Sequence, residues 1–220
     1  MRLTATVALL LLFTAALAEN YDYYVLATSW AGTTCLEKRC NAAQGISETF
    51  FNIHGLWPSR MSGPMGPFAC ENIPFSMDVF TPNTLSLMKQ FWSGLYGSTE
   101  DFHNHEWTKH GSCWANDMNG ANPIDDYFRK SIELGLRYNA YNALEKGGVT
   151  PGKAYTVSQI VKALTLSYKP GSFGLVCSQK GLKEVRICLD RNYQLTECPA
   201  NVGKFNCGGN VQFPALPSSF

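Results

Sequence analysis

Alternation of apolar and polar positions in the first third of the chain predicts two β-strands. Residues 23–30 are rich in aromatic and β-branched side chains, and so are residues 49–56. The second run is followed by Trp57-Pro58-Ser59, which we interpret as the turn that ends the strand. The Gly- and Pro-rich segment 62–67 then predicts a loop.

Apolar residues at helical spacing predict helices in the middle of the chain. Residues 76–96 contain one that starts after Pro82. Its expected apolar face consists of Leu85, Leu87, Met88 and Phe91. Asp101 can cap a second, short helix that runs to His110 and that Gly111 would terminate.

The second half of the chain predicts longer helices followed by strands. Pro123 suits the first turn of a helix through Leu144, which Gly147-Gly148 would end, and residues 156–168 form a further amphipathic helix. Strand-like runs follow at 174–177, 184–189 and 194–198. Because these elements do not alternate as βαβ units, we expect an α+β fold, a single domain with a mostly antiparallel sheet flanked by helices.

The N-terminal segment is interpreted as a secretory signal peptide rather than as part of the fold. Arg2 precedes an apolar run, and Ala16-Leu17-Ala18 matches a small-x-small cleavage signal. The run is too short to span a bilayer. We therefore expect a signal peptide at residues 1–18 and a single folded domain at residues 19–220, with no membrane segment.

Cysteine content and charge narrow the class of protein. Eight cysteines follow the expected signal peptide, an even number that indicates disulfides, and the absence of any C-x-x-C pair argues against structural zinc. Lys and Arg total 18 against 17 Asp and Glu, and no basic run occurs. Such a balance disfavours a protein that coats nucleic acid. RNA, if it is the partner, would be a substrate bound at a small site.

Three of the four histidines lie within residues 102–113. On an α-helix, His105, Glu106, Lys109 and His110 would fall within about 140° of one another, with Phe102 in the same band. Zinc signatures place two histidines four residues apart, whereas these are five apart, so we expect no metal. A solvated charged face is the plain alternative, and the nearby aromatic residues argue against it.

Two short motifs resemble those of the ribonuclease T2 family. The fourth histidine, His54, begins His-Gly-Leu-Trp-Pro, and His105 begins His-Glu-Trp-x-Lys-His-Gly-x-Cys. The two occur in the family's order about fifty residues apart. By itself, a histidine on a strand is more often a core residue than a catalyst, so the pairing of the motifs supports the resemblance.

The resemblance implies four disulfides and a set of site residues. The implied pairs are Cys35–Cys40, Cys70–Cys113, Cys177–Cys207 and Cys188–Cys198. It implies His110 as the base and His54 as the acid of a transfer step that forms a 2′,3′-cyclic phosphate, with Glu106 assisting. Histidine suits both roles because its pKa of about 6.5 lies near the working pH.

The remaining implied roles concern the substrate. The resemblance assigns His105 and Lys109 to the phosphate, and Trp57 and Phe102 to the flanking bases of single-stranded RNA. Stacking tolerates every base, so we expect broad specificity. Ser59 replaces a common Asp, which leaves base preference open. His103, which also replaces a common family residue, is interpreted as a surface residue.

The expected protein is therefore a metal-independent, cofactor-free endoribonuclease, a monomer that is secreted or delivered to an endolysosomal or vacuolar lumen. The alternative is an inactive secreted recognition protein on the same fold, which would be expected to lack one of the two catalytic histidines. A secreted metallohydrolase is a further alternative, and resistance of the activity to EDTA would distinguish it. The sequence leaves the biological role open.

Overall fold

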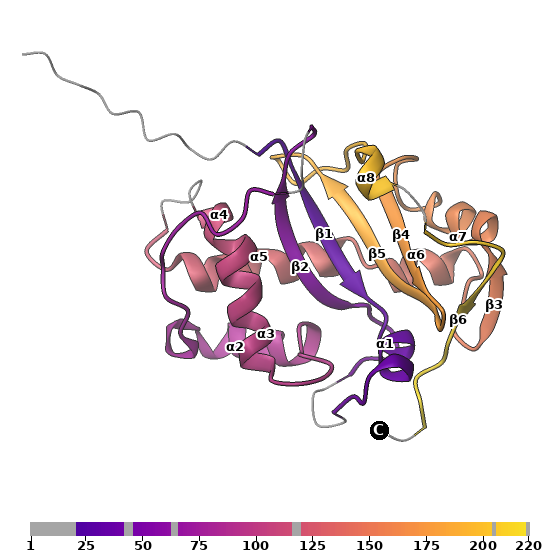
Figure 1. Ribbon diagram of the computed structural model, residues 1–220, viewed down its shortest axis with the longest axis horizontal. Helices are drawn as coiled ribbons and strands as arrows, with labels where there is room; N and C mark the ends of the chain where they lie inside the picture. The colour runs from indigo at the N-terminus through magenta and orange to yellow at the C-terminus, as the bar shows by residue number, and fades with distance from the viewer. Residues whose placement is uncertain (1–20, 42–45, 63–65, 116–119, 204–205, 219–220) are drawn as a thin grey trace, which may run out of the picture.

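A four-stranded antiparallel sheet forms the centre of the molecule in this computed structural model, which describes residues 21–41, 46–62, 66–115, 120–203 and 206–218 (Figure 1). The strand order is β2-β1-β5-β4. The strands are β1 (Tyr23–Ser29), β2 (Asn52–Ser59), β4 (Phe173–Ser178) and β5 (Gly181–Leu189), and a separate pair consists of β3 (Lys153–Thr156) and β6 (Asn210–Phe213). The expected α+β single domain with an antiparallel sheet is confirmed.

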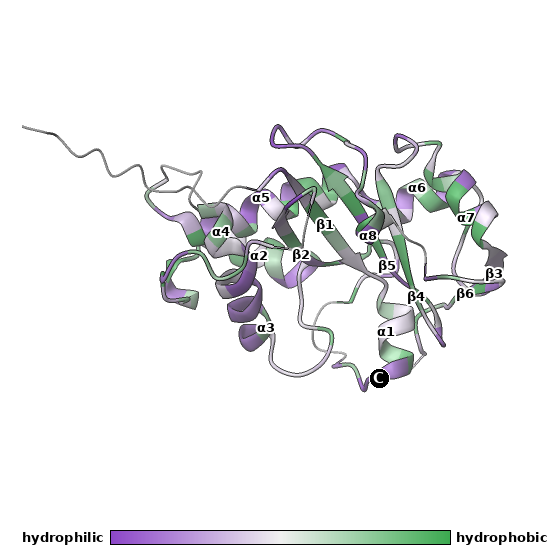
Figure 2. Cartoon of the chain, turned by 45° about the horizontal axis from the view of Figure 1, so that its top comes forward, coloured by the Kyte–Doolittle hydropathy of each residue, from purple (hydrophilic) through white to green (hydrophobic). Residues whose placement is uncertain are grey.

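Helices cover one face of the sheet and one end of it (Figure 1). The helices are α1 (Ala31–Glu37), η2 (Met77–Val79), α2 (Pro82–Phe91), α3 (Thr99–Glu106), the π-helical turn η3 (Trp107–Gly111), α4 (Ser112–Ala115), α5 (Pro123–Arg137), α6 (Ala140–Lys146), α7 (Val157–Leu164) and α8 (Ala200–Gly203). The largest core cluster lies between α5 and the sheet and includes Trp92, Tyr127 and Phe128. Strand β4 is drawn mostly in green and α3 mostly in purple in Figure 2, so α3 is a hydrophilic helix beside the sheet.

Strand β2 continues through Trp57-Pro58-Ser59, so the predicted turn is wrong. Since β2 is the edge strand, Pro58 removes no hydrogen bond that the sheet needs. The predicted strand at 194–198 is also wrong: it contributes one isolated bridge, between Leu195 and Leu189. The Cys188–Cys198 disulfide and a turn at Asp190 hold this segment instead.

The predicted helix over residues 101–110 differs at both ends. Ser98, not Asp101, caps α3, and its side chain accepts a hydrogen bond from Asp101 N. Gly111 does not terminate the helix, because the chain continues through η3 into α4. A Cβ at Gly111 would collide with Trp107 and Tyr127, so this glycine permits close packing.

The predicted helix over 123–144 is two helices in the structure. Helix α5 ends at Arg137, and Asn139 starts α6 by accepting a hydrogen bond from Asn142 N. Other local signals gave accurate helix starts, although the helix predicted over residues 156–168 ends at Leu164. Pro82 and Pro123 occupy the first turns of α2 and α5, and Thr156 forms a capping box at the start of α7.

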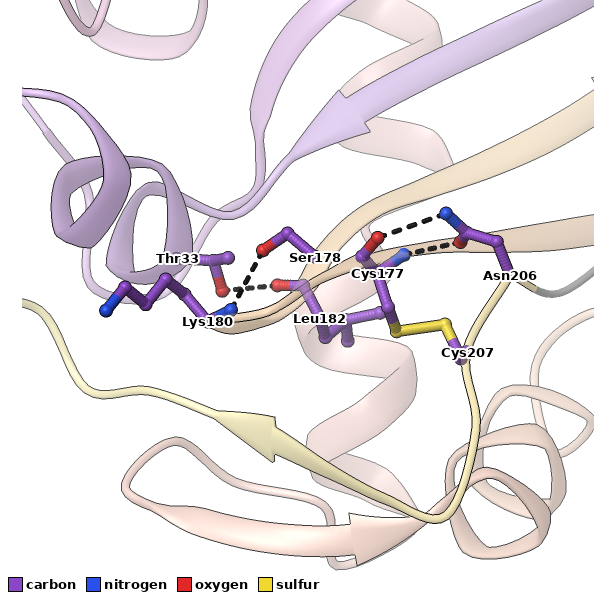
Figure 3. Close-up of a disulfide and its surroundings, with 7 residues drawn as sticks. All are labelled: Thr33, Cys177, Ser178, Lys180, Leu182, Asn206 and Cys207. Carbon is purple, nitrogen blue, oxygen red and sulfur yellow. Dashed lines mark hydrogen bonds between the residues drawn. A yellow bond between two sulfur atoms is a disulfide. The ribbon is translucent and has the colours of Figure 1, made fainter.

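Four disulfides link the fold with the pairing that the family resemblance implied: Cys35–Cys40, Cys70–Cys113, Cys177–Cys207 and Cys188–Cys198. Figure 3 shows the third, which ties β4 to the segment before β6. Beside it, Asn206 accepts a hydrogen bond from Cys177 N and donates one to Cys177 O.

The expected signal peptide, residues 1–18, lies outside the described residues. Among the residues that the structure does describe, no helix has the length and apolar character needed to cross a membrane.

Candidate active site

His54 lies at a β-bulge of the edge strand. In the β1–β2 register, Ala27 pairs with Gly55 and Thr28 with Ile53, so His54 is the extra residue between the two pairs. Bulges are frequent near active sites because they redirect a side chain. The backbone is fixed by Trp92, whose indole N–H donates to His54 O over 3.1 Å. About a third of the His54 side chain is exposed.

Two carboxylates flank the His54 imidazole. Its Nδ1 lies 2.8 Å from Glu184 Oε1 of β5, and its Nε2 lies 3.6 Å from Glu106 Oε1 at the end of α3. Burial opposes a positive charge on His54. The Glu184 hydrogen bond and the two negative charges outweigh burial, so the pKa of His54 is raised above its ordinary value.

Glu106 is buried beneath His54. Its Oε2 accepts a 2.8 Å hydrogen bond from the indole N–H of Trp57. Burial raises the pKa of Glu106 to about 7, although His54 and the Trp57 hydrogen bond act in the opposite direction. A Cβ at Gly55 would collide with this carboxylate and with the Trp57 indole, so the glycine of the first motif makes room for Glu106.

His110 lies on η3 and is buried at the same point. Its ring stacks on Trp57, with centroids 5.1 Å apart and an angle of 27° between planes, and the His54 ring meets Trp57 edge-on, also at 5.1 Å. The Phe68 ring contacts His110 at 5.5 Å. Burial, followed by the charges of Lys109, His105 and His54, lowers the pKa of His110 to about 3.

The predicted face is graded from solvent to core, in the order that an α-helix gives to these residues. Glu106 and His110 are buried, Lys109 is half-buried and His105 is exposed. Lys109 Nζ lies 5.3 Å from the centre of the Phe68 ring. His105 and Lys109 line a shallow depression on the protein surface. The five residues of the predicted face are therefore together: two face inward, two lie at the rim, and Phe102 is half-buried beside His54.

A pocket opens on the other side of His54. It is lined by Asn52, His54, Gly94, Leu95, Tyr96, Phe102 and Glu184, among others. Phe102, one of the two predicted base-binding residues, also contacts the His54 ring at 5.8 Å. Trp57, the other, is buried, with its ring against His110 and 5.3 Å from the Arg186 guanidinium.

His103 is buried, so its interpretation as a surface residue is wrong. It points into the core, where its Nε2–H donates to Trp92 O over 2.6 Å. Burial lowers the pKa of His103 to about 4. Among the described residues, its Nδ1 has no hydrogen-bond partner.

Three residues of the site were missed by sequence reasoning: Phe68, Glu184 and Arg186. Glu184 and Arg186 alternate along β5 and therefore share a face, which the sequence alone could have shown. Nothing in the sequence indicates that this face meets His54, because β1 lies between β5 and β2. No group of three or more potential metal ligands occurs among the described residues.

Comparison with known proteins identifies the family. The Ribonuclease T2 family model matches residues 21–198. The chain belongs to the Ribonuclease T2 family. It is 32% identical over 217 residues to Ribonuclease 1 of Arabidopsis thaliana, covering 90% of this chain and 89% of that protein. It is 30% identical over 214 residues to Extracellular ribonuclease LE of Solanum lycopersicum, covering 90% and 89% of the two chains.

The fold of this T2-family chain is also similar to that of solved structures. An RNase-related protein from Calystegia sepium matches with a TM-score of 0.75 and 26% identity, covering 90% of this chain and all of that one. The resemblance drawn from the two histidine motifs is thus confirmed, and so is the assignment to ribonucleases of the T2 type. The roles of individual residues stay predictions.

Proposed function

We propose that this protein is an endoribonuclease that cleaves single-stranded RNA by transphosphorylation, leaving 2′,3′-cyclic phosphate ends that it can then hydrolyse to 3′-phosphates. The observation that supports this most is the opposite electrostatic environment of two neighbouring histidines. The pKa of His54 is raised and that of His110 is lowered to about 3, so at mildly acidic pH one is protonated and the other is not. An acid–base pair requires this combination.

RNA supplies its own nucleophile, because each 2′-hydroxyl lies beside a phosphodiester. In the proposed first step, His110 removes the proton of the 2′-hydroxyl and the 2′-oxygen attacks phosphorus. His54 donates a proton to the departing 5′-oxygen. When water opens the cyclic phosphate, the two histidines exchange roles.

The negative charge that develops on the phosphoryl oxygens is met by Lys109, with His105 beside it at the rim. Glu106 lies between His54 and Trp57, where it can hold His54 and donate or accept a hydrogen bond, since its pKa is about 7. These groups supply the base, the acid and the positive charge, so we expect cleavage without a metal ion or cofactor.

For the bases, we assign Phe102 and the adjoining pocket to one side of the scissile phosphate. Trp57 is buried against His110 and donates to Glu106 in this structure, so its contact with a base stays a prediction. Stacking on aromatic rings is tolerant of base identity, so we expect broad specificity.

We further propose that the mature protein, residues 19–220, is a secreted or vacuolar monomer. Two observations support a destination in an oxidising compartment outside the cytosol. One is the match to a ribonuclease named as extracellular, and the other is the four disulfides. The alternative is an inactive recognition protein on the same fold. The retention of both histidines and their environments favours the enzyme.

The decisive test is digestion of RNA in EDTA at mildly acidic pH, comparing wild type, His54→Ala and His110→Ala. We expect wild-type activity with 2′,3′-cyclic phosphate products and a loss of at least 100-fold in each variant. Glu133→Gln, on the exposed face of α5, serves as the control and should match wild type. No cleavage by folded, disulfide-bonded wild type would favour the recognition protein, and cleavage abolished by EDTA would favour a metallohydrolase.

A further inference from the structure

We propose that Glu184 is a positioning residue that fixes the orientation and tautomer of His54 for proton transfer, with Arg186 holding Glu184 in place. This inference rests on the proposed function and extends its machinery to β5. The geometry that supports it is a chain of short contacts. His54 Nδ1 lies 2.8 Å from Glu184 Oε1, and Glu184 Oε2 accepts a 2.9 Å hydrogen bond from Arg186 Nε and forms an ion pair with Arg186 Nη2 at 2.8 Å.

Glu184 is a buried carboxylate, so its negative charge must be compensated by nearby groups. The residue is only 5% exposed, and burying a charge is costly unless it is paired and hydrogen-bonded. Its partners are the His54 imidazole, the Arg186 guanidinium and, at 3.4 Å, the Ser29 hydroxyl. Burial raises its pKa, but the interactions with His54 and Arg186 outweigh burial and lower it to about 2, so Glu184 stays ionised.

An ionised Glu184 determines which nitrogen of His54 exchanges protons. A carboxylate only accepts hydrogen bonds, so Nδ1 of His54 must carry the hydrogen that it donates to Glu184. The nitrogen that gains and loses the catalytic proton is therefore Nε2. That atom lies on the side of Glu106, towards the centre of the site.

Both oxygens of the Glu184 carboxylate are bound, which fixes the orientation of Glu184 and of the His54 ring. Arg186 binds the second oxygen of Glu184, and its guanidinium lies over the Trp57 ring, which in turn donates to Glu106. Glu184 and Arg186 are two residues apart on β5 and share one face of it. Together with the Glu106 contact to His54, these interactions form a closed ring of side chains that includes His54.

The charged groups around His54 come from three elements. Glu184 and Arg186 face it from β5, Glu106 and His105 from α3, and His110 from η3. Of these, the two carboxylates favour protonated His54, whereas Arg186 opposes it. Removing the charge of Glu184 should therefore lower the pKa of His54.

The variants that test this are Glu184→Gln, which keeps the shape and a hydrogen-bond acceptor but removes the charge, and Glu184→Asp, which keeps the charge on a shorter side chain. Val185→Ala is the matched control for destabilisation. It shortens a fully buried side chain in the same strand that points to the opposite face.

Two measurements distinguish a positioning role of Glu184 from a purely structural one. One is the pH profile of kcat and KM on a dinucleotide substrate, and the other is NMR titration of the His54 ring in the free protein. For Glu184→Gln we expect kcat to fall about 10-fold or more with little change in KM. The alkaline limb of kcat/KM and the His54 titration midpoint should both move to lower pH. Glu184→Asp should restore part of both shifts, and Val185→Ala should change neither.

An active wild type combined with an unmoved His54 titration in Glu184→Gln would overturn the positioning role while leaving the proposed function intact. A folded wild type with no ribonuclease activity would instead refute the proposed function. The NMR titration would still report whether Glu184 controls the charge of His54.

Discussion

Single residues of this protein show how burial selects the charge state of a histidine. His103 and His110 are both buried on consecutive turns of one helical segment, and burial lowers the pKa of each, to about 4 and about 3. His54, only partly covered and placed between two carboxylates, has a raised pKa. Charged partners, rather than residue type, thus separate the proposed acid from the proposed base.

His103 should make the protein less stable in acid. In the unfolded chain a histidine binds a proton below about pH 6.5, whereas folded His103 resists protonation down to about pH 4. Stability is therefore fully present above pH 6.5 and is lost as the pH falls towards 4, by about 3 kcal/mol from this residue. A protonated Nδ1 would also lie in the core without an acceptor among the described residues.

The variant His103→Gln keeps a donor for Trp92 O and removes the titration. Urea unfolding at pH 7 and pH 4 should show that the variant loses about 2 to 3 kcal/mol less than wild type between the two pH values. His110 titrates in both proteins, so its contribution cancels. Equal losses in the two proteins would show that His103 binds its proton at the same pH in the folded protein as in the unfolded chain.

At the scale of elements, the site depends on how closely β2 approaches the end of α3 and η3. Gly55 lies where any side chain would enter the space of Glu106 and Trp57. Gly111 does the same against Trp107 and Tyr127. The two glycines of the sequence motifs are therefore explained by packing between elements rather than by turns.

Gly55→Ala should displace Glu106 and Trp57 and so disturb both histidines. We expect a loss of about 1 to 3 kcal/mol in unfolding free energy from the overpacking, and at least a 10-fold loss of ribonuclease activity. Gly208→Ala is the control, since its Cβ would meet nothing within 4 Å and it should leave both unchanged. Chemical denaturation and RNA cleavage measured on the same preparations would check this, and full activity in Gly55→Ala would contradict the packing argument.

Local signals predicted the elements that local chemistry determines. Pro82, Pro123 and the Thr156 capping box set helix starts, and the aromatic run of β1 set a strand. Elements and contacts that depend on distant partners could not be predicted. The two-stranded sheet of β3 and β6 joins short segments far apart in the chain, and α1 packs against β5.

The site divides in the same way. The motif residues His54, Glu106 and His110 were predicted through the family resemblance, and the structure brings them together around Trp57. Glu184 could not, because its contact with His54 joins strands that are not neighbours in the sheet. His103 was interpreted as a surface residue because nothing in the local sequence shows that Trp92 lies beside it.

For the whole molecule, the disulfides differ in what they constrain. Cys70–Cys113 closes the widest sequence separation, 43 residues, and joins the segment that carries Phe68 to the start of α4. Two hydrogen bonds reinforce that junction, from Ala69 N to Lys109 O and from Cys70 N to the Ser112 hydroxyl. Cys35–Cys40 spans only 5 residues at the far end of α1.

Removing Cys70–Cys113 by a double alanine substitution should cost about 4 kcal/mol of unfolding free energy, against about 2 kcal/mol for Cys35–Cys40, because the longer loop restricts the unfolded chain more. The first variant should also lose ribonuclease activity, since Phe68 covers His110. The second should keep it. Thermal and urea unfolding with activity assays would check this. Equal losses of unfolding free energy in the two variants would show that loop length does not determine the stabilisation by these disulfides.

The π-helical turn at Trp107–Gly111 lies within the second motif, and it makes the number of residues in that motif important for the structure. A π turn accommodates one residue more than an α turn. Deletion of a single residue between Glu106 and His110 would shorten their spacing from four residues to three. It would also remove the turn that presents His110 to the Trp57 ring. The spacing of this motif is thus tied to the packing of His110, and we expect length variation to be tolerated in the surface loops and not here.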